Sequence, residues 1–256
     1  MIHATAIIHP NARLEDGVSV GPYAVIGEGV SIGSGTSVGP HAVIEGPTVI
    51  GRDNRIFQFA SVGAVPQDLK FHGETTWLKI GDRNTIREFV TLHRGTEDGG
   101  GETVIGDDNL FMAYSHVAHD CRVGNRVILA NCATLAGHVQ IDDHAILGGL
   151  SAVHQFTRVG AHTMISGGSM VAQDIPPYTI AQGDRAKTVG INIVGLKRRG
   201  YSEAVLRSIK TAYKLVYRSD LRIEEALQRI DAELEASPEL QLFVDFLRGS
   251  ERGLAR

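Results

Sequence analysis

The chain has 256 residues, a formal net charge of −4 and 43% hydrophobic residues, so it is long enough for one or two folded domains. The small negative charge gives no general affinity for nucleic acid. No apolar run reaches the length of a membrane span and the start, MIHATAIIHP, lacks a signal-peptide pattern, so we expect a cytoplasmic protein. Cys121 and Cys132 are expected to be reduced structural residues rather than a disulfide or a nucleophile.

The dominant feature of the chain is an aliphatic residue, once a phenylalanine, at every sixth position. The first series comprises Ile8, Leu14, Val20, Ile26, Ile32, Val38, Ile44, Ile50, Ile56 and Val62. Neither a helix, with a period of 3.6, nor a simple strand, with a period of 2, repeats every six residues. A hexapeptide repeat is the signature of a parallel β-helix, and it predicts this fold. Glycine is expected to supply the positive φ that the tight corners need.

The repeat is interrupted twice before a second long series begins. The two excursions cover roughly 64–78 and 94–104. The second series comprises Ile105, Phe111, Val117, Val123, Leu129, Leu135, Ile141, Leu147, Val153, Val159, Ile165 and Val171. Insertions in a solenoid usually lie on one face, and that face is often the functional one.

After Pro176-Pro177 the hexapeptide pattern stops and helical patterns follow. We expect helices over about 203–218, capped by Ser202, over about 223–235, and from Ser237-Pro238 onward. The sequence therefore predicts a β-helix over residues 1–188 and a helical domain over 189–256. The helices are expected to cover the open end of the last coil.

Histidines gather at one predicted edge of the coil. Three hexads make one turn, so residues 18 apart stack, and the stack that begins at His119 continues through Gly137 and Gln155. His116, His138 and His154 lie beside the same stack, whereas His144 and His162 stack on another edge and are interpreted as solvated surface. Such a cluster can bind zinc, as in hexapeptide-repeat proteins of the carbonic-anhydrase kind, or act in acid–base catalysis.

Short segments along the whole chain carry a more specific resemblance. They are PQDLK (66–70), SHVAHDC (115–121), NCATLAGHV (131–139), AVHQF (152–156), AQDIPPY (172–178) and GLKRRGY (195–201). In these segments the chain resembles the UDP-N-acetylglucosamine O-acyltransferases, which begin lipid A biosynthesis.

The resemblance implies a left-handed parallel β-helix that forms a homotrimer with its sites in the clefts between subunits. It implies transfer of an (R)-3-hydroxyacyl group from acyl carrier protein to the 3-hydroxyl of UDP-N-acetylglucosamine. The donor carries its acyl group on 4′-phosphopantetheine, and no metal or other cofactor is implied.

The resemblance also assigns roles to residues. It makes His119 the general base, Asp120 its orienting partner, the N–H of Gly137 the oxyanion donor, and Asp68 a residue that positions the substrates. Substrate contacts are implied for Gln67, Lys70, His116, His138, His154, Gln155, Asn192, Arg198 and Arg199. Gly167 matches the residue at the far end of the acyl groove, where the missing side chain predicts a chain of about fourteen rather than ten carbons.

Elementary chemistry agrees with this assignment. Attack by a hydroxyl group on a thioester needs a base and a fixed donor for the tetrahedral oxyanion, and no serine or cysteine nucleophile is required. The basic run Lys197-Arg198-Arg199 suits a diphosphate or a phosphopantetheine phosphate. Two alternatives are a trimeric zinc enzyme of the carbonic-anhydrase type and a β-helix scaffold without catalytic activity.

Overall fold

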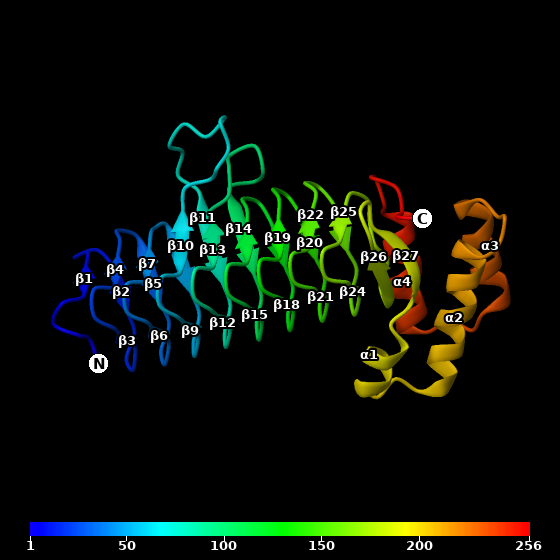
Figure 1. Cartoon of the computed structure of the whole chain (residues 1–256), viewed down its shortest axis with the longest axis horizontal. Coiled ribbons are helices and arrows are strands. Elements are labelled where there is room, and N and C mark those ends of the chain that lie inside the picture. The colour runs from blue at the N-terminus through cyan, green and yellow to red at the C-terminus, as the bar shows by residue number, and fades with distance from the viewer.

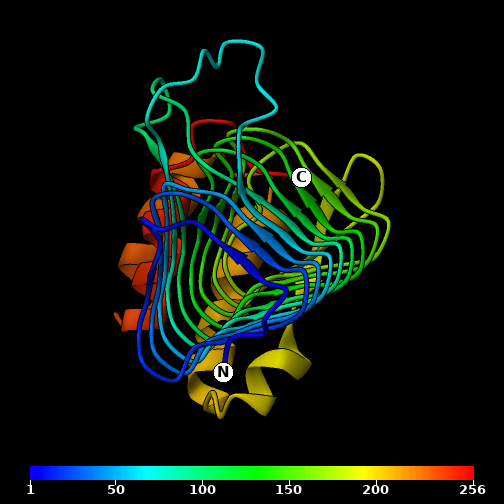
Figure 2. The same cartoon turned by 90° about the vertical axis from the view of Figure 1, so that its left-hand side faces the viewer.

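The computed structural model describes residues 1–256 and shows a long three-sided coil followed by a group of helices (Figure 1). The view along the coil shows its triangular cross-section (Figure 2). Face 1 is a nine-stranded sheet of β1 (Ile7–Ile8), β4 (Val25–Ile26), β7 (Val43–Ile44), β10 (Ser61–Ala64), β13 (Thr91–His93), β16 (His116–Val117), β19 (Thr134–Leu135), β22 (Ala152–Val153) and β25 (Met170–Val171).

The other two faces are built in the same way. Face 2 is an eight-stranded sheet of β2 (Arg13–Leu14), β5 (Val30–Ile32), β8 (Thr48–Ile50), β11 (Trp77–Ile80), β14 (Glu102–Ile105), β17 (Arg122–Val123), β20 (Gln140–Ile141) and β23 (Arg158–Val159). Face 3 is a ten-stranded sheet of β3 (Ser19–Val20), β6 (Ser37–Val38), β9 (Arg55–Ile56), β12 (Thr85–Ile86), β15 (Leu110–Phe111), β18 (Ile128–Leu129), β21 (Ile146–Leu147), β24 (Met164–Ile165), β26 (Thr179–Gln182) and β27 (Lys187–Ile191). The chain visits faces 1, 2 and 3 in turn, and we name the corners 1–2, 2–3 and 3–1 after the faces they join.

The predicted inward register is confirmed. Residues 18 apart pair in parallel, as Ile7 does with Val25, and the repeated aliphatic residues are buried from Val20 onward. Ile8 and Leu14, in the first coil, are only partly buried. One apolar core of 39 buried residues therefore fills the whole coil and makes it a rigid scaffold.

The corners differ from the expectation that glycine would supply their positive φ. Seventeen residues other than glycine have φ between +54° and +69°. One reason is stacking at the 3–1 corner, where the rings of Tyr23, His41, Phe59, Phe89 and Tyr114 follow one another with centroids 4.8–5.3 Å apart. Contact between side chains of successive coils offsets the cost of the left-handed conformation, which is about 1–2 kcal/mol per residue.

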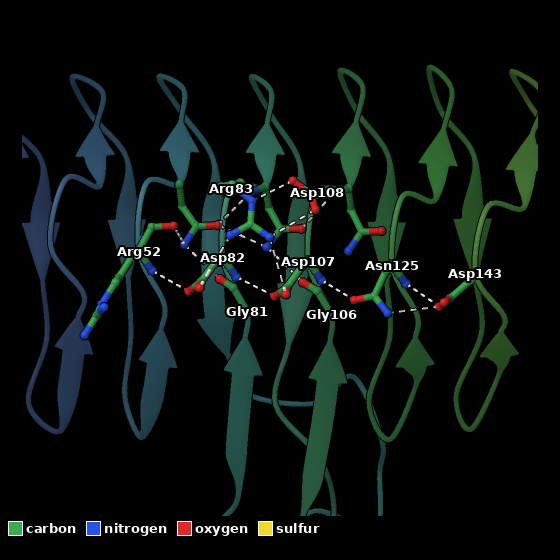
Figure 3. Close-up of polar contacts among 12 residues, drawn as sticks. Arg52, Gly81, Asp82, Arg83, Gly106, Asp107, Asp108, Asn125 and Asp143 are labelled. Atoms are coloured by element: carbon green, nitrogen blue, oxygen red, sulfur yellow. Dashed lines mark hydrogen bonds and ion pairs between the residues drawn. The ribbon is translucent and has the colours of Figure 1, made fainter. Parts of the chain in front are cut away.

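At the 2–3 corner a row of side-chain oxygens links one coil to the next (Figure 3). The Asp82 carboxylate accepts from the N–H of Arg52 at 2.7 Å, the Asp107 carboxylate from the N–H of Asp82 at 2.8 Å, and the Asn125 amide oxygen from the N–H of Asp107 at 2.8 Å. A Cβ at Gly81 would lie 2.1 Å from the Asp107 oxygen, so glycine leaves the space that this contact needs.

Both excursions leave the coil at the 1–2 corner. The first joins β10 to β11 over residues 65–76 and the second joins β13 to β14 over 94–101. The two excursions lie side by side above the coil in Figures 1 and 2. Because they enter and leave at the same corner, the coil continues in phase beyond them.

The helical region comprises α1 (Ile193–Arg198), α2 (Glu203–Tyr217), α3 (Ile223–Glu233) and α4 (Pro238–Arg248). Ser202 and Ser237 cap α2 and α4 as predicted, whereas α1 was not predicted. The division expected after residue 188 falls inside β27, because the chain adds one antiparallel strand before it turns helical. None of the four helices has the length and apolar character needed to cross a bilayer.

The last coil is closed by strands rather than directly by helices. Ala181 of β26, Ala186 of the following turn and Ala255 of the C-terminal segment are members of the coil's core. Leu254 forms a parallel bridge with Asp174 and so extends the coil. The helices form a separate core of 14 buried residues.

Candidate active site

A histidine and a buried aspartate form the centre of the 1–2 corner. His119 and Asp120 lie between β16 and β17, and the His119 Nδ1 is 2.7 Å from the Asp120 Oδ2. The Asp120 side chain is fully buried and that of His119 is 14% exposed. A carboxylate can only accept, so Nδ1–H donates and Nε2 keeps its lone pair. That Nε2 has no hydrogen-bond partner within the chain.

The second excursion holds this aspartate in place. Thr96 donates to Asp120 twice, through its N–H at 2.8 Å and its hydroxyl at 2.6 Å. Burial alone would raise the pKa of Asp120, but the hydrogen bonds from His119 and Thr96 outweigh burial and lower that pKa. A Cβ at Gly99 would lie 1.9 Å from the Asp120 carboxyl carbon, so this loop needs glycine where it approaches the carboxylate. The sequence pattern gave no sign of this contact.

The next coil places Gly137 against the His119 ring. A Cβ on Gly137 would lie 2.6 Å from the His119 Cε1 and 2.8 Å from its Nε2. The Gly137 carbonyl accepts from Phe156, but its N–H has no partner in the chain. The corner thus brings a free ring nitrogen and a free backbone donor together, as the 18-residue spacing predicted.

His138 is the second histidine of the corner. Its ring meets that of His119 edge-on at 5.2 Å and stacks on Phe156 at 4.3 Å, and its Nε2 lies 3.7 Å from the Asp120 Oδ2. Burial lowers the pKa of His138, although Asp120 partly opposes this. His138 is therefore biased towards the neutral imidazole.

His116 and an unpredicted partner, His93, lie on face 1 beside this corner. His116 Nδ1 is 2.6 Å from the Thr91 hydroxyl, and the rings of His93 and His116 meet edge-on at 4.9 Å. Burial, reinforced by His116 and His119, lowers the pKa of His93 to about 4. His93 directly follows Leu92, in the register that precedes the second excursion, and this was the one sequence signal that could have revealed it.

The remaining predicted residues at the 1–2 corner are more exposed. His154 and Gln155 lie on the surface, where the His154 Nδ1 is 3.3 Å from an Arg252 nitrogen. Asp68 and Lys70 line a cavity of about 290 Å³ between the two excursions, together with Thr96. Gln67 is exposed in the same excursion.

The basic residues lie at a different corner. Arg199 contacts the His144 Nδ1 through its Nη1 at 2.5 Å at the 2–3 corner, and Arg198 is exposed beside it. Asn192 is buried as the N-cap of α1, where it accepts from the Gly195 N–H and donates to the His162 carbonyl. Within one chain these residues do not meet His119.

The stacking predicted for His144 and His162 is confirmed, with ring centroids 4.6 Å apart. The solvated interpretation is wrong for His162, whose Nε2 lies 3.0 Å from the Tyr201 hydroxyl. Burial, reinforced by His144 and Arg199, lowers the pKa of His162 to about 4. The two rings therefore contact the end of α1 and the segment that follows it, through Arg199 and Tyr201.

Gly167 lies at the third corner. It follows β24 and is exposed at the 3–1 corner beside Gly149, where a Cβ would lie 3.2 Å from the Gly149 carbonyl oxygen. Gly167 lies a whole number of hexads after His119, but it is at the 3–1 corner and His119 is at the 1–2 corner.

Both cysteines are free, so the predicted absence of a disulfide is confirmed. The buried Cys121 thiol donates to the Ala136 carbonyl at 3.1 Å, and burial raises its pKa to about 12. A thiol with so high a pKa is a poor nucleophile.

A cavity of about 860 Å³ lies elsewhere, between face 2 and α4. It contains His144 and His162 but neither His119 nor Gly137. A smaller cavity of about 660 Å³ reaches Asp120 and His138. Because the free imidazole nitrogen and the free N–H are at the 1–2 corner, this corner is the candidate active site.

His119, Asp120 and His138 could also hold a metal ion, since one ligand atom from each lies within 4.8 Å of the others. In the structure, however, both Asp120 oxygens already accept hydrogen bonds from Thr96, and Oδ2 also binds His119. A zinc ion at 2.0–2.2 Å from its ligands would have to displace these bonds. The arrangement suits an oriented base better than a metal site.

The fold and this corner define a class of protein: an acyltransferase of the hexapeptide-repeat type. A family model described as bacterial transferase hexapeptide matches residues 102–137, and one described as UDP-N-acetylglucosamine O-acyltransferase, domain 2, matches residues 174–255.

Solved structures extend the match to the whole chain. The LpxA of Acinetobacter baumannii is 47% identical, with 100% of this chain and 99% of that chain covered at a TM-score of 0.97. The LpxA of Bacteroides fragilis is 44% identical with both chains fully covered, and the UDP-N-acetylglucosamine acyltransferase of Francisella novicida is 42% identical with 100% and 94% covered, each at 0.97. The chain belongs to the UDP-N-acetylglucosamine O-acyltransferase family, and its coil is the left-handed parallel β-helix of that family.

Proposed function

We propose that the protein transfers an (R)-3-hydroxyacyl group from acyl carrier protein to the 3-hydroxyl of UDP-N-acetylglucosamine, the first step of lipid A biosynthesis. The observation that carries the proposal is the Asp120-oriented His119 ring, whose free Nε2 faces the Gly137 backbone. Family membership supplies the substrate class, since the similar proteins are UDP-N-acetylglucosamine acyltransferases.

The proposed reaction is a direct transfer. His119 Nε2 takes the proton of the sugar hydroxyl as its oxygen attacks the thioester carbonyl carbon. The Gly137 N–H stabilises the oxyanion of the tetrahedral intermediate, and Asp120 stabilises the imidazolium that forms. Collapse of the intermediate breaks the carbon–sulfur bond, and His119 returns its proton to the thiolate of the carrier arm.

The proposal is tested by incubating the purified protein with UDP-N-acetylglucosamine and a panel of 3-hydroxyacyl carrier proteins. We expect a UDP-sugar ester that mass spectrometry detects, together with free carrier thiol in equal amount. An unloaded carrier protein is the control. No ester with any acyl length would refute the proposed activity.

We further propose that the protein is a homotrimer, because two faces of the coil are apolar on the outside. The outward residues of the later strands are Leu110, Ile128, Ile146 and Met164 on face 3, and His116, Thr134, Ala152 and Met170 on face 1. Those of face 2 are polar or charged, apart from Trp77 and Val104: Lys79, Glu102, Arg122, Gln140 and Arg158. Burial of faces 1 and 3 against other copies removes apolar surface from water.

This packing would also complete the site. If face 1 of one copy lies on face 3 of the next, the 1–2 corner of the first meets the 2–3 corner of the second. His119 of one copy then shares a cleft with Arg198 and Arg199 of the next, although the two corners are separate within one chain. The cleft would run inward to the 3–1 corner, where Gly167 lies.

Both cysteines are free, which suits a reducing compartment such as the cytoplasm.

The shared cleft predicts complementation between two defective variants. His119→Ala and the double variant Arg198→Ala/Arg199→Ala should each be nearly inactive at low UDP-N-acetylglucosamine concentration. Unfolding and refolding them together at equal amounts should restore about one quarter of wild-type activity, because random assembly of a cyclic trimer pairs two intact corners at that frequency. Lys210→Ala/Lys214→Ala, on an exposed face of α2, is the matched control and should behave as wild type. Recovery no greater than the sum of the separate variants would contradict the shared site.

The proposed mechanism needs no metal ion. Exhaustive dialysis against a chelator should leave turnover within about twofold of the untreated enzyme, since Thr96 and His119 already occupy the Asp120 oxygens. Activity that disappears on chelation and returns with zinc would favour the zinc alternative.

Acyl length is proposed to be set by Gly167. Wild type should prefer about fourteen carbons, with about 0.8 kcal/mol gained for each methylene buried along the groove. Gly167→Met should shift the preference towards ten carbons in competition assays with mixed donors. Gly190→Met, where a Cβ would meet nothing within 4 Å, is the control. An unchanged length profile in Gly167→Met would place the stop elsewhere.

A further inference from the structure

A cavity of about 320 Å³ lies where the helical region joins the end of the coil. Three segments form it: the start of β27, the C-terminal end of α2 with the two residues that follow it, and Arg256. The cavity is lined by Lys187, Thr188, Val189, Val216, Tyr217, Arg218, Ser219 and Arg256. None of these residues takes part in the proposed acyl transfer, so the cavity is a separate candidate site.

Three cations line this cavity, and no carboxylate side chain does. Arg218 donates to the Val189 carbonyl at 3.4 Å, and Arg256 donates to the Val216 carbonyl at 3.1 Å. Neither arginine, nor the exposed Lys187, forms an ion pair with an aspartate or a glutamate. Each guanidinium group has five N–H donors, so most of these donors remain free.

The end of α2 accounts for only part of this positive charge. The carbonyl groups at the C-terminal end of a helix together carry roughly −0.5 of an elementary charge, which a single cation balances. Three cations around one helix end therefore leave a surplus of positive charge, and a bound anion would neutralise it.

Two hydroxyl groups in the cavity wall also lack partners. Thr188 is 8% exposed, and its Oγ1 and the Tyr217 hydroxyl are both buried without a hydrogen bond. The two residues are close neighbours, but their oxygens do not have hydrogen-bond geometry. Burial raises the pKa of Tyr217, so its hydroxyl group stays protonated and can donate. A ligand with acceptor oxygens would satisfy both hydroxyl groups, which are unfavourable while they are buried and unpaired.

We propose that this cavity binds a phosphate group through the side chains of Lys187, Arg218, Arg256 and Thr188. Guanidinium groups match the oxygens of a phosphate, whose charge of about −1.5 to −2 suits three cations better than the single charge of a carboxylate. The volume is at the lower end of the range for ligand sites, so the phosphate group belongs to inorganic phosphate or to a small monoester.

A phosphate in this position would join three segments that already meet. The Thr188 N–H donates to the Ala255 carbonyl at 3.3 Å, and Ala255 belongs to the core of the coil. Phosphate should therefore raise the melting temperature of the protein at constant ionic strength, because a ligand that binds only the folded state stabilises it.

Calorimetric titration of the purified protein with inorganic phosphate, at constant ionic strength, tests the site. Arg198→Gln/Arg199→Gln is the background variant, since these two arginines could hold a phosphate in the proposed active site. In this background we expect one phosphate bound per chain. Addition of Lys187→Gln/Arg218→Gln should weaken binding by about tenfold or more, because hydrogen bonds to charged groups contribute at least that much.

Two further variants separate a built site from general electrostatic attraction. Thr188→Val keeps the size and charge of the residue but removes its hydroxyl group, and it should weaken binding by about fivefold. Lys210→Gln/Lys214→Gln removes two charges from exposed positions of α2 that do not line the cavity, and it should leave the affinity unchanged.

A parallel titration with glycerol 3-phosphate distinguishes the two sources of the phosphate group. Tighter binding of inorganic phosphate would indicate the free ion, and tighter binding of the ester would indicate a phosphorylated metabolite. Absence of binding of both in the background variant would overturn the site. The site would also be overturned by unchanged affinity in Thr188→Val or by equal weakening in the α2 control, because either result describes a diffuse positive surface. All these outcomes leave the proposed acyl transfer untouched, since the two sites share no residue.

Discussion

His119→Ala should fold and assemble normally yet lose activity by about 10²–10⁴-fold, the contribution expected of a general base. The change removes the one imidazole whose Nε2 is free and whose Nδ1 is fixed by a buried carboxylate. The loss should fall on kcat, because the ring accepts the proton in the transition state and contributes less to binding of the sugar substrate. Steady-state rates with saturating donor and acceptor measure it.

The control for this variant is His9→Ala, at the 1–2 corner of the first coil and several coils away from His119. His9→Ala should match wild type in rate. Both variants should match wild type in melting temperature and in molecular mass by light scattering. A folded His119→Ala enzyme with near-normal kcat would show that another group takes the proton.

Gly137→Ala should be nearly as damaging, although it adds only one methyl group. The new Cβ would lie 2.6 Å from the His119 Cε1, closer than carbon atoms can approach, so the ring must tilt. A ring that tilts weakens its 2.7 Å bond to Asp120 and moves Nε2 away from the backbone N–H. We expect kcat to fall by about 10²-fold, since small displacements of a catalytic group have effects of this size.

The matched control is Gly190→Ala, where a Cβ would meet nothing within 4 Å. A crystal structure of Gly137→Ala should show the displaced His119 ring. Normal kcat with the ring undisturbed would mean that neither the close contact nor the backbone donor matters for turnover.

The sequence predicted the structure best where the six-residue repeat itself determines the position of a residue. The aliphatic at every sixth position must point inward, so Val20 and Ile165 could be placed in the core from the sequence alone. The 18-residue spacing likewise placed Gly137 beside His119, because stacked coils translate sequence distance directly into spatial distance.

Contacts that leave the repeat could not be predicted. Thr96 reaches Asp120 from an excursion whose path is set by its own turns and not by the period of six. Gly99 of this excursion is needed for a close approach to the Asp120 carboxylate, and the six-residue repeat does not extend to it. The same holds for Arg199, whose position depends on α1, a helix of six residues that carries no repeated pattern.

The corner positions show a further limit. A period of six fixes the phase of a residue but not which of the three faces it follows, so Gly167 and His119 look equivalent until the turns are counted. The excursions add residues that are not part of any turn, and counting across them from the sequence is uncertain by one face.

Because rows of contacts join the coils at each corner, the coil can change in length only in steps of one full turn, which is eighteen residues. Removal of one hexad would rotate every later residue by a third of a turn, so that oxygens now aligned with the N–H groups of Arg52 and Asp82 would face a different edge. Deletion of a whole turn would preserve all alignments and merely shorten the molecule. The two excursions are exempt, since each departs and returns at one corner. Length variation among related proteins should therefore collect in these loops or come in whole turns.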